Sequence, residues 1–269
     1  MAALIISVSS DIGLAIAKDW TESKHEVIGT YRNKDALPGL SKLGIDAFHC
    51  DLSLRASIAS FLGDIRRVPK ATRINRVVFA AGDLNPIGKF GDNSFSDWRE
   101  SLQINFVSQL EILHSLIPLV KPGGRFMFFA GGGTNGAVEH YSAYTISKIA
   151  SIKVCELLAA EYPEHVFFAL GPGWVDTKIH EQTLMAGPMA GRNHQKTRSI
   201  LRGGEAVPMK TVVEAINTLM ATPGELVTGR NFSVAHDPIG QESLSEALLG
   251  NDNLFKLRRE GNQIFQSEQ

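Results

Sequence analysis

Short apolar runs recur along the whole chain, with polar and mixed stretches between them. Each run is continuously apolar rather than alternating, a pattern typical of strands buried on both faces. We therefore predict strands at Ala3–Val8, Glu26–Tyr31, Asp46–Cys50, Arg76–Ala80, Gly124–Ala130, His165–Leu170 and Asn231–Ala235.

Amphipathic segments of helical period separate these runs. They predict helices at Ile12–Ser23, Ser53–Arg66, Ser96–Val120, Ser142–Tyr162 and Pro208–Thr222. Strand-helix alternation favours an α/β fold, namely a Rossmann-type doubly wound parallel β-sheet of about seven strands flanked by helices on both faces. No linker or repeat interrupts it, so we expect residues 1–269 to form a single domain.

Two regions break this rhythm. Residues 177–207 separate the sixth and seventh strands, and residues 237–269 follow the last strand as a polar C-terminal extension. Ligands of open parallel sheets bind at the carboxyl ends of the strands, where insertions can cover them. The insertion at 177–207 is therefore the predicted substrate loop.

Composition narrows the function classes. A net charge of -1 and a pI near 6.7 give no reason to expect nucleic acid or an acidic membrane as partner. Two cysteines are too few for a disulfide framework, and no apolar run approaches the roughly 20 residues that span a bilayer. We expect a soluble cytoplasmic protein without a metal site, and we expect Cys155 to be a core residue.

Tyr144 and Lys148 are four residues apart, so their side chains lie on one face of the predicted helix. An ammonium group near a phenol stabilises the phenolate and lowers its pKa from about 10. The pair is therefore a candidate acid/base, although a five-residue pattern with two fixed positions is equally consistent with a helix surface.

The first strand leads through small residues, from Ser7 to Gly13, directly into a helix. Free backbone N–H groups at such a helix N-terminus favour a phosphate. An ordinary strand-helix turn explains the same residues, so this motif alone decides little.

Taken together, these landmarks resemble the short-chain dehydrogenase/reductase family in its single-domain form. The matching positions, in order, are the degenerate turn Ser7–Gly13, Asp51-Leu52, Ala80-Ala81-Gly82, Asn105, Tyr144 with Lys148, and Pro172-Gly173 with Thr177. The resemblance implies that Tyr144 exchanges a proton with the substrate oxygen, that Lys148 lowers its pKa and bonds the nicotinamide ribose, and that Asn105 holds a water of the proton relay. It implies a dinucleotide site at Ser7, Ser9, Asp11, Ile12, Gly13, Tyr31, Arg32, Asp51, Leu52, Ala80, Ala81, Gly82, Lys148, Pro172, Gly173, Val175 and Thr177.

The second strand ends in Tyr31-Arg32. A carboxylate at this place commonly holds the ribose 2′-OH of NAD, whereas an arginine accommodates the 2′-phosphate of NADP. We therefore predict NADP over NAD, with a solvent-exposed arginine as the plain alternative.

The chain departs from the family pattern at four positions. Ser7 and Asp11 replace glycines, Ala80 replaces an asparagine, and no serine stands about a dozen residues before Tyr144. That serine normally bonds the substrate carbonyl. Thr134 is the predicted hydroxyl substitute, with Asn135 and the backbone N–H groups of residues 131–133 as alternatives.

The substrate is predicted from the insertion and the residues beside it. Arg198 and Arg202 either grip an anionic substrate or lie on a solvated helix face, and Trp174 and His140 are expected as aromatic walls of the cleft. The leading hypothesis is an NADP(H)-dependent oxidoreductase that interconverts a carbonyl and a secondary alcohol on a polar, anionic or sugar-like small molecule. A catalytically impaired nucleotide-binding sensor and a nucleotide-sugar epimerase or dehydratase are the alternatives. The resemblance also implies a homodimer or homotetramer.

Overall fold

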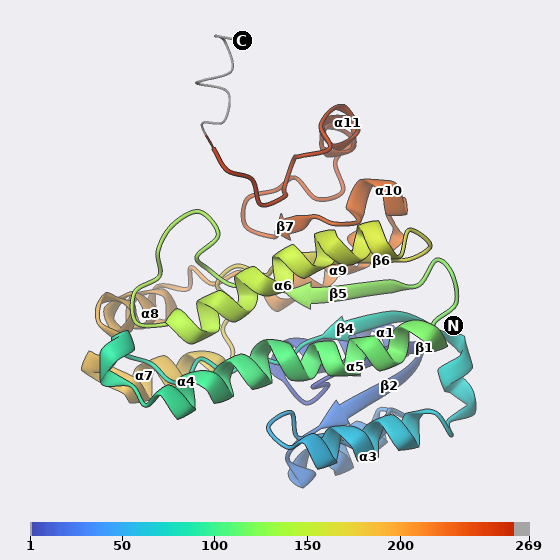
Figure 1. The fold of residues 1–269 in the computed structure, drawn as a ribbon, viewed down its shortest axis with the longest axis horizontal. Helices are drawn as coiled ribbons and strands as arrows, with labels where there is room; N and C mark the ends of the chain where they lie inside the picture. Colours follow the sequence, from blue (N-terminus) through green and yellow to red (C-terminus); the bar gives the residue numbers. More distant parts are fainter. Residues whose placement is uncertain (1, 261–269) are drawn as a thin grey trace.

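A seven-stranded parallel sheet forms the centre of the computed structural model, which describes residues 2–260 (Figure 1). The strands lie in the order β3-β2-β1-β4-β5-β6-β7. Their bounds are β1 (Ala2–Ile6), β2 (Glu26–Tyr31), β3 (Asp46–His49), β4 (Ile74–Phe79), β5 (Arg125–Phe129), β6 (Val166–Gly171) and β7 (Asn231–Ser233). All seven predicted strands are confirmed, with ends that differ by a few residues, and so is the Rossmann-type fold class.

Helices cover both faces of this sheet, and each face buries its own apolar cluster. The first cluster packs α1 (Asp11–Glu22), α2 (Leu37–Lys42), α9 (Met209–Ala221), α10 (Gly224–Val227) and α11 (Glu242–Gly250) against one face. The second packs α3 (Arg55–Ile65), α5 (Ser108–Leu116) and α6 (Ser142–Glu161) against the other, which faces the viewer in Figure 1. Cys155 is fully buried in the second cluster, as predicted.

The long helix predicted at Ser96–Val120 is not continuous. It consists of α4 (Phe95–Leu102), a π-helical turn at Gln103–Val107, α5 and a 3-10 turn at Ile117–Leu119. Single π-turns occur frequently at functional sites, and Asn105 lies inside this one. Sequence periodicity cannot reveal one extra residue in a helical turn.

The predicted substrate loop is mostly helical. It forms α7 (Ile179–Ala186), a 3-10 turn (Gly187–Ala190) and α8 (Arg192–Gly203). None of the helices described between residues 2 and 260 is long and apolar enough to cross a membrane.

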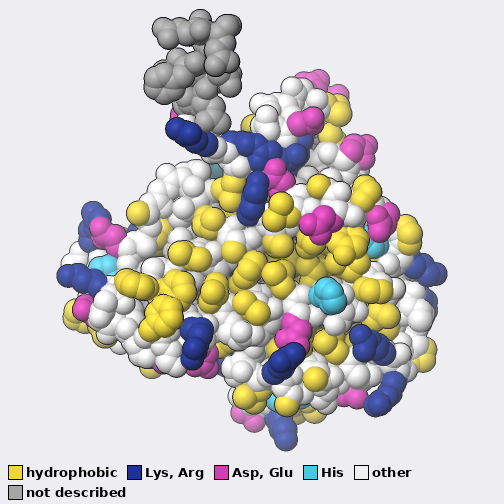
Figure 2. All heavy atoms as spheres, viewed as in Figure 1, with side chains coloured by type: hydrophobic (Ala, Val, Ile, Leu, Met, Phe, Trp, Pro, Cys, Tyr) yellow, Lys and Arg dark blue, Asp and Glu magenta, His cyan; other side chains and the backbone are white. Residues whose placement is uncertain are grey.

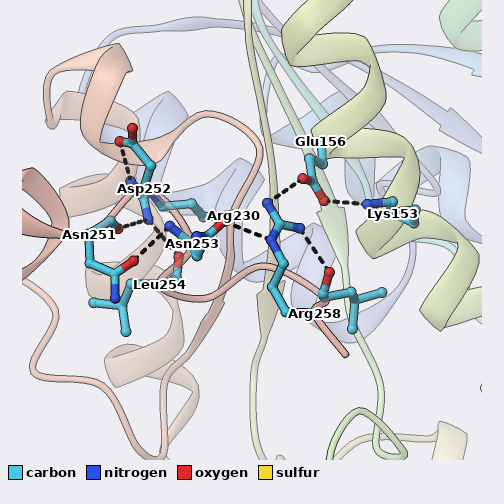
Figure 3. Close-up of polar contacts among 9 residues, drawn as sticks. Lys153, Glu156, Arg230, Asn251, Asp252, Asn253, Leu254 and Arg258 are labelled. Atoms are coloured by element: carbon cyan, nitrogen blue, oxygen red, sulfur yellow. Dashed lines mark hydrogen bonds and ion pairs between the residues drawn. The ribbon is translucent and has the colours of Figure 1, made fainter. Parts of the chain in front are cut away.

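The polar C-terminal extension folds back onto the sheet after α11. Arg230, whose side chain is 3% exposed, donates hydrogen bonds to the carbonyl oxygens of Leu248, Asn251 and Leu254. Arg258 forms an ion pair of 2.7 Å with Glu156 on α6 (Figure 3). We call residues 251–258 the C-terminal strap. Residues 261–269, the end of the predicted extension, lie outside the described residues.

Candidate active site

A cleft of about 1690 Å³ runs along the carboxyl ends of the strands. It brings together most of the residues predicted from the sequence: Ser7, Ser9, Asp11, Ile12, Arg32, Asp51, Leu52, Ala80, Ala81, Gly82, Thr134, Tyr144, Lys148, Pro172, Gly173, Trp174, Val175 and Thr177. Six predicted residues are not among the described residues that line it: Gly13, Tyr31, Asn105, His140, Arg198 and Arg202.

Tyr144 and Lys148 lie side by side on α6 within this cleft. The Lys148 Nζ is 5.6 Å from the centroid of the Tyr144 ring and donates a hydrogen bond to the carbonyl oxygen of Ala81, just beyond β4. Lys148 is 2% exposed, so its ammonium has little access to water. The four-residue spacing thus correctly predicted that the side chains of Tyr144 and Lys148 lie close together.

The pKa values of this pair are set mainly by burial. Burial raises the pKa of Tyr144 to about 12 and lowers the pKa of Lys148 to about 8. We expected Lys148 to lower the pKa of the phenol, and in the protein alone the direction is the opposite. The cause is burial, which penalises the charged phenolate relative to the neutral phenol.

Gly131 lies against Tyr144 and Lys148 where the chain leaves β5. A Cβ atom on it would stand 3.0 Å from Cε1 of Tyr144 and 3.2 Å from Cγ of Lys148. A side chain at this position would therefore displace the tyrosine ring, which gives a physical reason for the glycine.

Thr134 and Thr145 are the candidates to replace the hydroxyl of the missing serine. Thr134 lines the cleft, as predicted. Thr145 lines it as well, and its Oγ1 is buried without a hydrogen-bond partner among the described residues. Sequence reasoning missed Thr145, because only the packed structure reveals an unsatisfied hydroxyl.

Asn105 is buried behind the residues that line the cleft. Its amide is fully buried and bonds both the N–H and the carbonyl oxygen of Asp83, each at 2.8 Å, and the carbonyl oxygen of Ser101 at 3.0 Å. These bonds fix the loop after β4 that carries Ala81, the acceptor for Lys148. The side chain of Asn105 thus supports the wall of the cleft, and its predicted role in holding a water of the proton relay stays a prediction.

The turn between β1 and α1 has the form of a phosphate site. Ser10 caps α1 by accepting a hydrogen bond from the N–H of Gly13, and a Cβ on Gly13 would stand 2.6 Å from the carbonyl oxygen of Ser7. Ser7 itself has a φ of 65°, a left-handed conformation that glycine adopts at lower cost. Ser7 thus adopts a backbone conformation that glycine favours, at a position where the family resemblance places a glycine.

The other end of the cleft, at β2 and β3, carries Arg32 and Asp51. Arg32 is exposed at the end of β2 and has no ion-pair partner among residues 2–260. Tyr31 instead faces the core, 8% exposed, with its ring edge-on to His49. Asp51 Oδ1 accepts hydrogen bonds from the N–H and Oγ of Ser53, which holds the Asp51-Leu52 segment at the cleft.

An aromatic pair, Trp174 and His180, forms part of the cleft wall after β6. The two rings stack at 3.7 Å with an interplanar angle of 11°, and His180 Nε2 donates to the carbonyl oxygen of Val175 at 2.9 Å. His180 was not predicted. His140 was, but its Nδ1 donates to the carbonyl oxygen of Met189, so it fastens the substrate loop outside the cleft.

Helix α8 presents a different face to the cleft than expected. Arg192, Asn193, Lys196 and Thr197 line the cleft, whereas Arg198 and Arg202 lie elsewhere on the helix. Helical periodicity explains this, since residues i, i+1, i+4 and i+5 share one side. Of the two cleft cations, Arg192 pairs with Glu139 at 2.9 Å and Lys196 has no ion-pair partner among the described residues.

Comparisons with known proteins agree with this geometry. Residues 7–236 match the family described as enoyl-(acyl carrier protein) reductase. An uncharacterized oxidoreductase of Schizosaccharomyces pombe is 27% identical over 240 residues, which are 84% of this chain and 93% of that protein. An NADPH-dependent pterin aldehyde reductase of Arabidopsis thaliana is 28% identical over 185 residues, 65% of this chain and 75% of that protein. A short-chain dehydrogenase/reductase from Saccharomyces cerevisiae superposes with a TM-score of 0.78 at 23% identity, covering 91% of this chain and 98% of that one.

The fold and the Tyr144/Lys148 site define an oxidoreductase that acts between a carbonyl and an alcohol. The chain belongs to the short-chain dehydrogenase/reductase family. This family implies a nicotinamide dinucleotide, and the cleft fits one: it extends from Arg32 past the N-terminus of α1 to Lys148 and Val175. When bound, the nicotinamide supplies the hydride, and the protein supplies position and proton transfer.

Proposed function

We propose that this chain is an NADPH-dependent reductase of a polar, anionic small molecule that carries an aldehyde or ketone. Tyr144 gives its phenolic proton to the substrate oxygen, and its raised pKa means that the proton is present at neutral pH. Lys148, held by Ala81, lies beside it to receive the nicotinamide ribose. The aldehyde reductase of Arabidopsis thaliana, a relative named as NADPH-dependent, supports the same direction and cofactor.

The preference for NADPH is argued chiefly from Arg32. It follows β2 directly and lines the cleft without an ion-pair partner among residues 2–260, and its neighbours Tyr31 and Asn33 supply no carboxylate for a ribose 2′-OH. A guanidinium free of internal partners can bond a 2′-phosphate through two N–H groups.

Fluorescence titration of the two reduced nucleotides tests this. We expect NADPH to bind at least about tenfold more tightly than NADH, which corresponds to about 1.4 kcal/mol, and Arg32→Ala to abolish the difference. Lys34→Ala is the matched control, because Lys34 is an exposed neighbouring cation outside the cleft wall. Equal affinities in the wild-type protein would contradict the preference.

The anionic substrate is argued from Lys196. Its position on the cleft face of α8 without an ion-pair partner in the described chain makes it a cation available to a substrate carboxylate or phosphate. Lys196→Glu is expected to raise the KM for an anionic carbonyl compound about tenfold or more. The same reversal at Arg198, outside the cleft wall, is expected to raise it less. The reverse order would support the original prediction of Arg198 and Arg202.

A homodimer or homotetramer and a cytoplasmic location belong to the same proposal. Exposed apolar side chains gather over α6 and the π-helical turn before α5, including Val107 at 41%, Ile146 at 51% and Leu157 at 51% exposure (Figure 2). Such patches commonly mark protein interfaces. Sedimentation of the wild-type protein and of Leu157→Glu tests the assembly: the variant is expected to sediment as a smaller species.

A further inference from the structure

Asp11 joins the two sides of the cleft. It is the first residue of α1, and its Oδ2 accepts a hydrogen bond of 2.7 Å from the backbone N–H of Lys178. Its Oδ1 lies 3.6 Å from Lys178 Nζ. Lys178 directly precedes α7, 167 residues further along the chain. Both residues line the cleft.

These two segments leave strands that are far apart in the sheet. Between β1 and β6 lie β4 and β5, so the separation is three strand steps, about 14 Å at the usual spacing. The segment after β6 must therefore reach back over the ends of β4 and β5 to meet Asp11. The contact therefore links the cleft residues that follow β1 to those that follow β6, across the carboxyl ends of β4 and β5.

The segment that reaches back is fastened at further points. Val207 donates its N–H to the carbonyl oxygen of Trp174, and His180 donates to the carbonyl oxygen of Val175. These bonds hold the backbone of Lys178 in an ordered turn. The hydrogen bond from its backbone N–H to the Asp11 carboxylate is charge-assisted. The exposed Nζ contributes less, because an ion pair with a 78% exposed lysine is largely screened.

We infer that Asp11 is a positioning residue that closes the segment after β6 over the central part of the bound dinucleotide. A glycine, which the family resemblance places here, has no side chain to make this contact. The carboxylate therefore retains the nucleotide through Lys178, even though it adds a negative charge near a phosphate site. This inference rests on the proposed nucleotide-dependent function.

The change in NADPH affinity caused by Asp11→Gly shows whether the Asp11 carboxylate retains the nucleotide or repels its phosphate. If Asp11 retains the nucleotide, Asp11→Gly raises the dissociation constant and the release rate of NADPH about tenfold in stopped-flow fluorescence. If the carboxylate chiefly repels the phosphate, the same substitution tightens binding. Tighter or unchanged binding overturns the inference. Asp176→Asn is the matched control, since Asp176 is an exposed carboxylate of the same segment outside the cleft wall.

Hydrogen exchange of the nucleotide-free protein provides a readout that does not depend on turnover. The Lys178 amide is expected to be protected in the wild-type protein and in Lys178→Met, which keeps the backbone donor, and to lose protection in Asp11→Gly. An unprotected amide in the wild-type protein would overturn the contact itself. A wild-type protein that binds neither NADPH nor NADH would defeat the proposed function, whereas normal binding unaffected by Asp11→Gly would defeat only the closure.

Discussion

The Nζ of Lys148 donates a hydrogen bond to the carbonyl oxygen of Ala81 at 3.2 Å while it lies 5.6 Å from the ring centroid of Tyr144. A neutral carbonyl thus holds a buried ammonium, and no carboxylate among residues 2–260 pairs with it. Charged groups in such surroundings destabilise the fold. Lys148, the proposed catalytic lysine, is therefore expected to lower the stability of the fold.

Substitution of this lysine tests that cost. The pKa of Lys148 is about 8 in the folded protein and 10.5 for an unperturbed lysine. Below pH 8 both states are protonated and the folded state bears the full cost; between these two values only the unfolded chain keeps its proton, so the free energy of unfolding rises with pH. Lys148→Met should raise the free energy of unfolding at neutral pH by up to about 3 kcal/mol. It should also abolish the increase of this free energy between pH 8 and pH 10.5. Urea denaturation across this pH range measures both, and a less stable variant would contradict the argument.

Ser7 gives a second stability prediction. Its φ of 65° is costly for a residue with a Cβ atom, so Ser7→Gly should raise the free energy of unfolding by about 1 kcal/mol. Thermal denaturation without nucleotide measures the gain. Ser10→Gly, which removes the α1 cap but relieves no strain, should instead lower stability. A loss of stability in Ser7→Gly would show that the serine hydroxyl matters more than the backbone strain.

The C-terminal strap provides a pH-dependent prediction. The hydrogen bond from Arg258 holds the pKa of Glu156 at about 2, below its ordinary 4.5 (Figure 3). This stabilisation is complete above pH 4.5 and is lost as the pH falls towards 2. Glu156→Gln should cost about 1 kcal/mol at neutral pH, since Arg258 is partly exposed, and less in acid. Limited proteolysis should cut the strap faster in the variant; equal rates at neutral pH would contradict its anchoring by Glu156.

Thr134 and Thr145 compete for the role of the missing serine. Loss of a hydroxyl that bonds the substrate carbonyl should lower kcat by about 10² or more. Thr134→Ala tests the residue predicted from the sequence, and Thr145→Val tests the buried hydroxyl without a protein partner. The variant with the larger fall in kcat at unchanged NADPH affinity identifies the donor. If neither affects kcat, the backbone N–H groups of residues 131–133 remain as the donors.

The sequence predicted the strands and the proximity of Tyr144 and Lys148 well because both depend on local patterns. Buried parallel strands are continuously apolar, and Tyr144 and Lys148 meet through the geometry of one helix. The orientation of a predicted helix is harder to obtain. Lys196 lies on the side of α8 that lines the cleft, whereas Arg198 and Arg202 lie on other sides. Packing of α8 against α7 sets which side meets the cleft.

The remaining features depend on how the chain packs rather than on its local sequence. Asp11 was predicted as a departure from the glycine pattern, and its partner Lys178 lies 167 residues away. Nothing in either local sequence indicates the pairing. His180 and Thr145 were missed for the same reason: stacking on Trp174 and an unsatisfied buried hydroxyl are properties of the packed structure.

Tyr144→Phe tests the central claim most directly. The substitution removes only the phenolic oxygen and leaves the ring beside Gly131 and Lys148. NADPH oxidation is followed with a panel of polar aldehydes and ketones, and NADPH affinity is measured in parallel. We predict that the wild-type protein reduces at least one anionic carbonyl compound and that Tyr144→Phe binds NADPH with unchanged affinity but loses at least about 10² in kcat. Turnover that survives in Tyr144→Phe would contradict the role of Tyr144 as the proton donor.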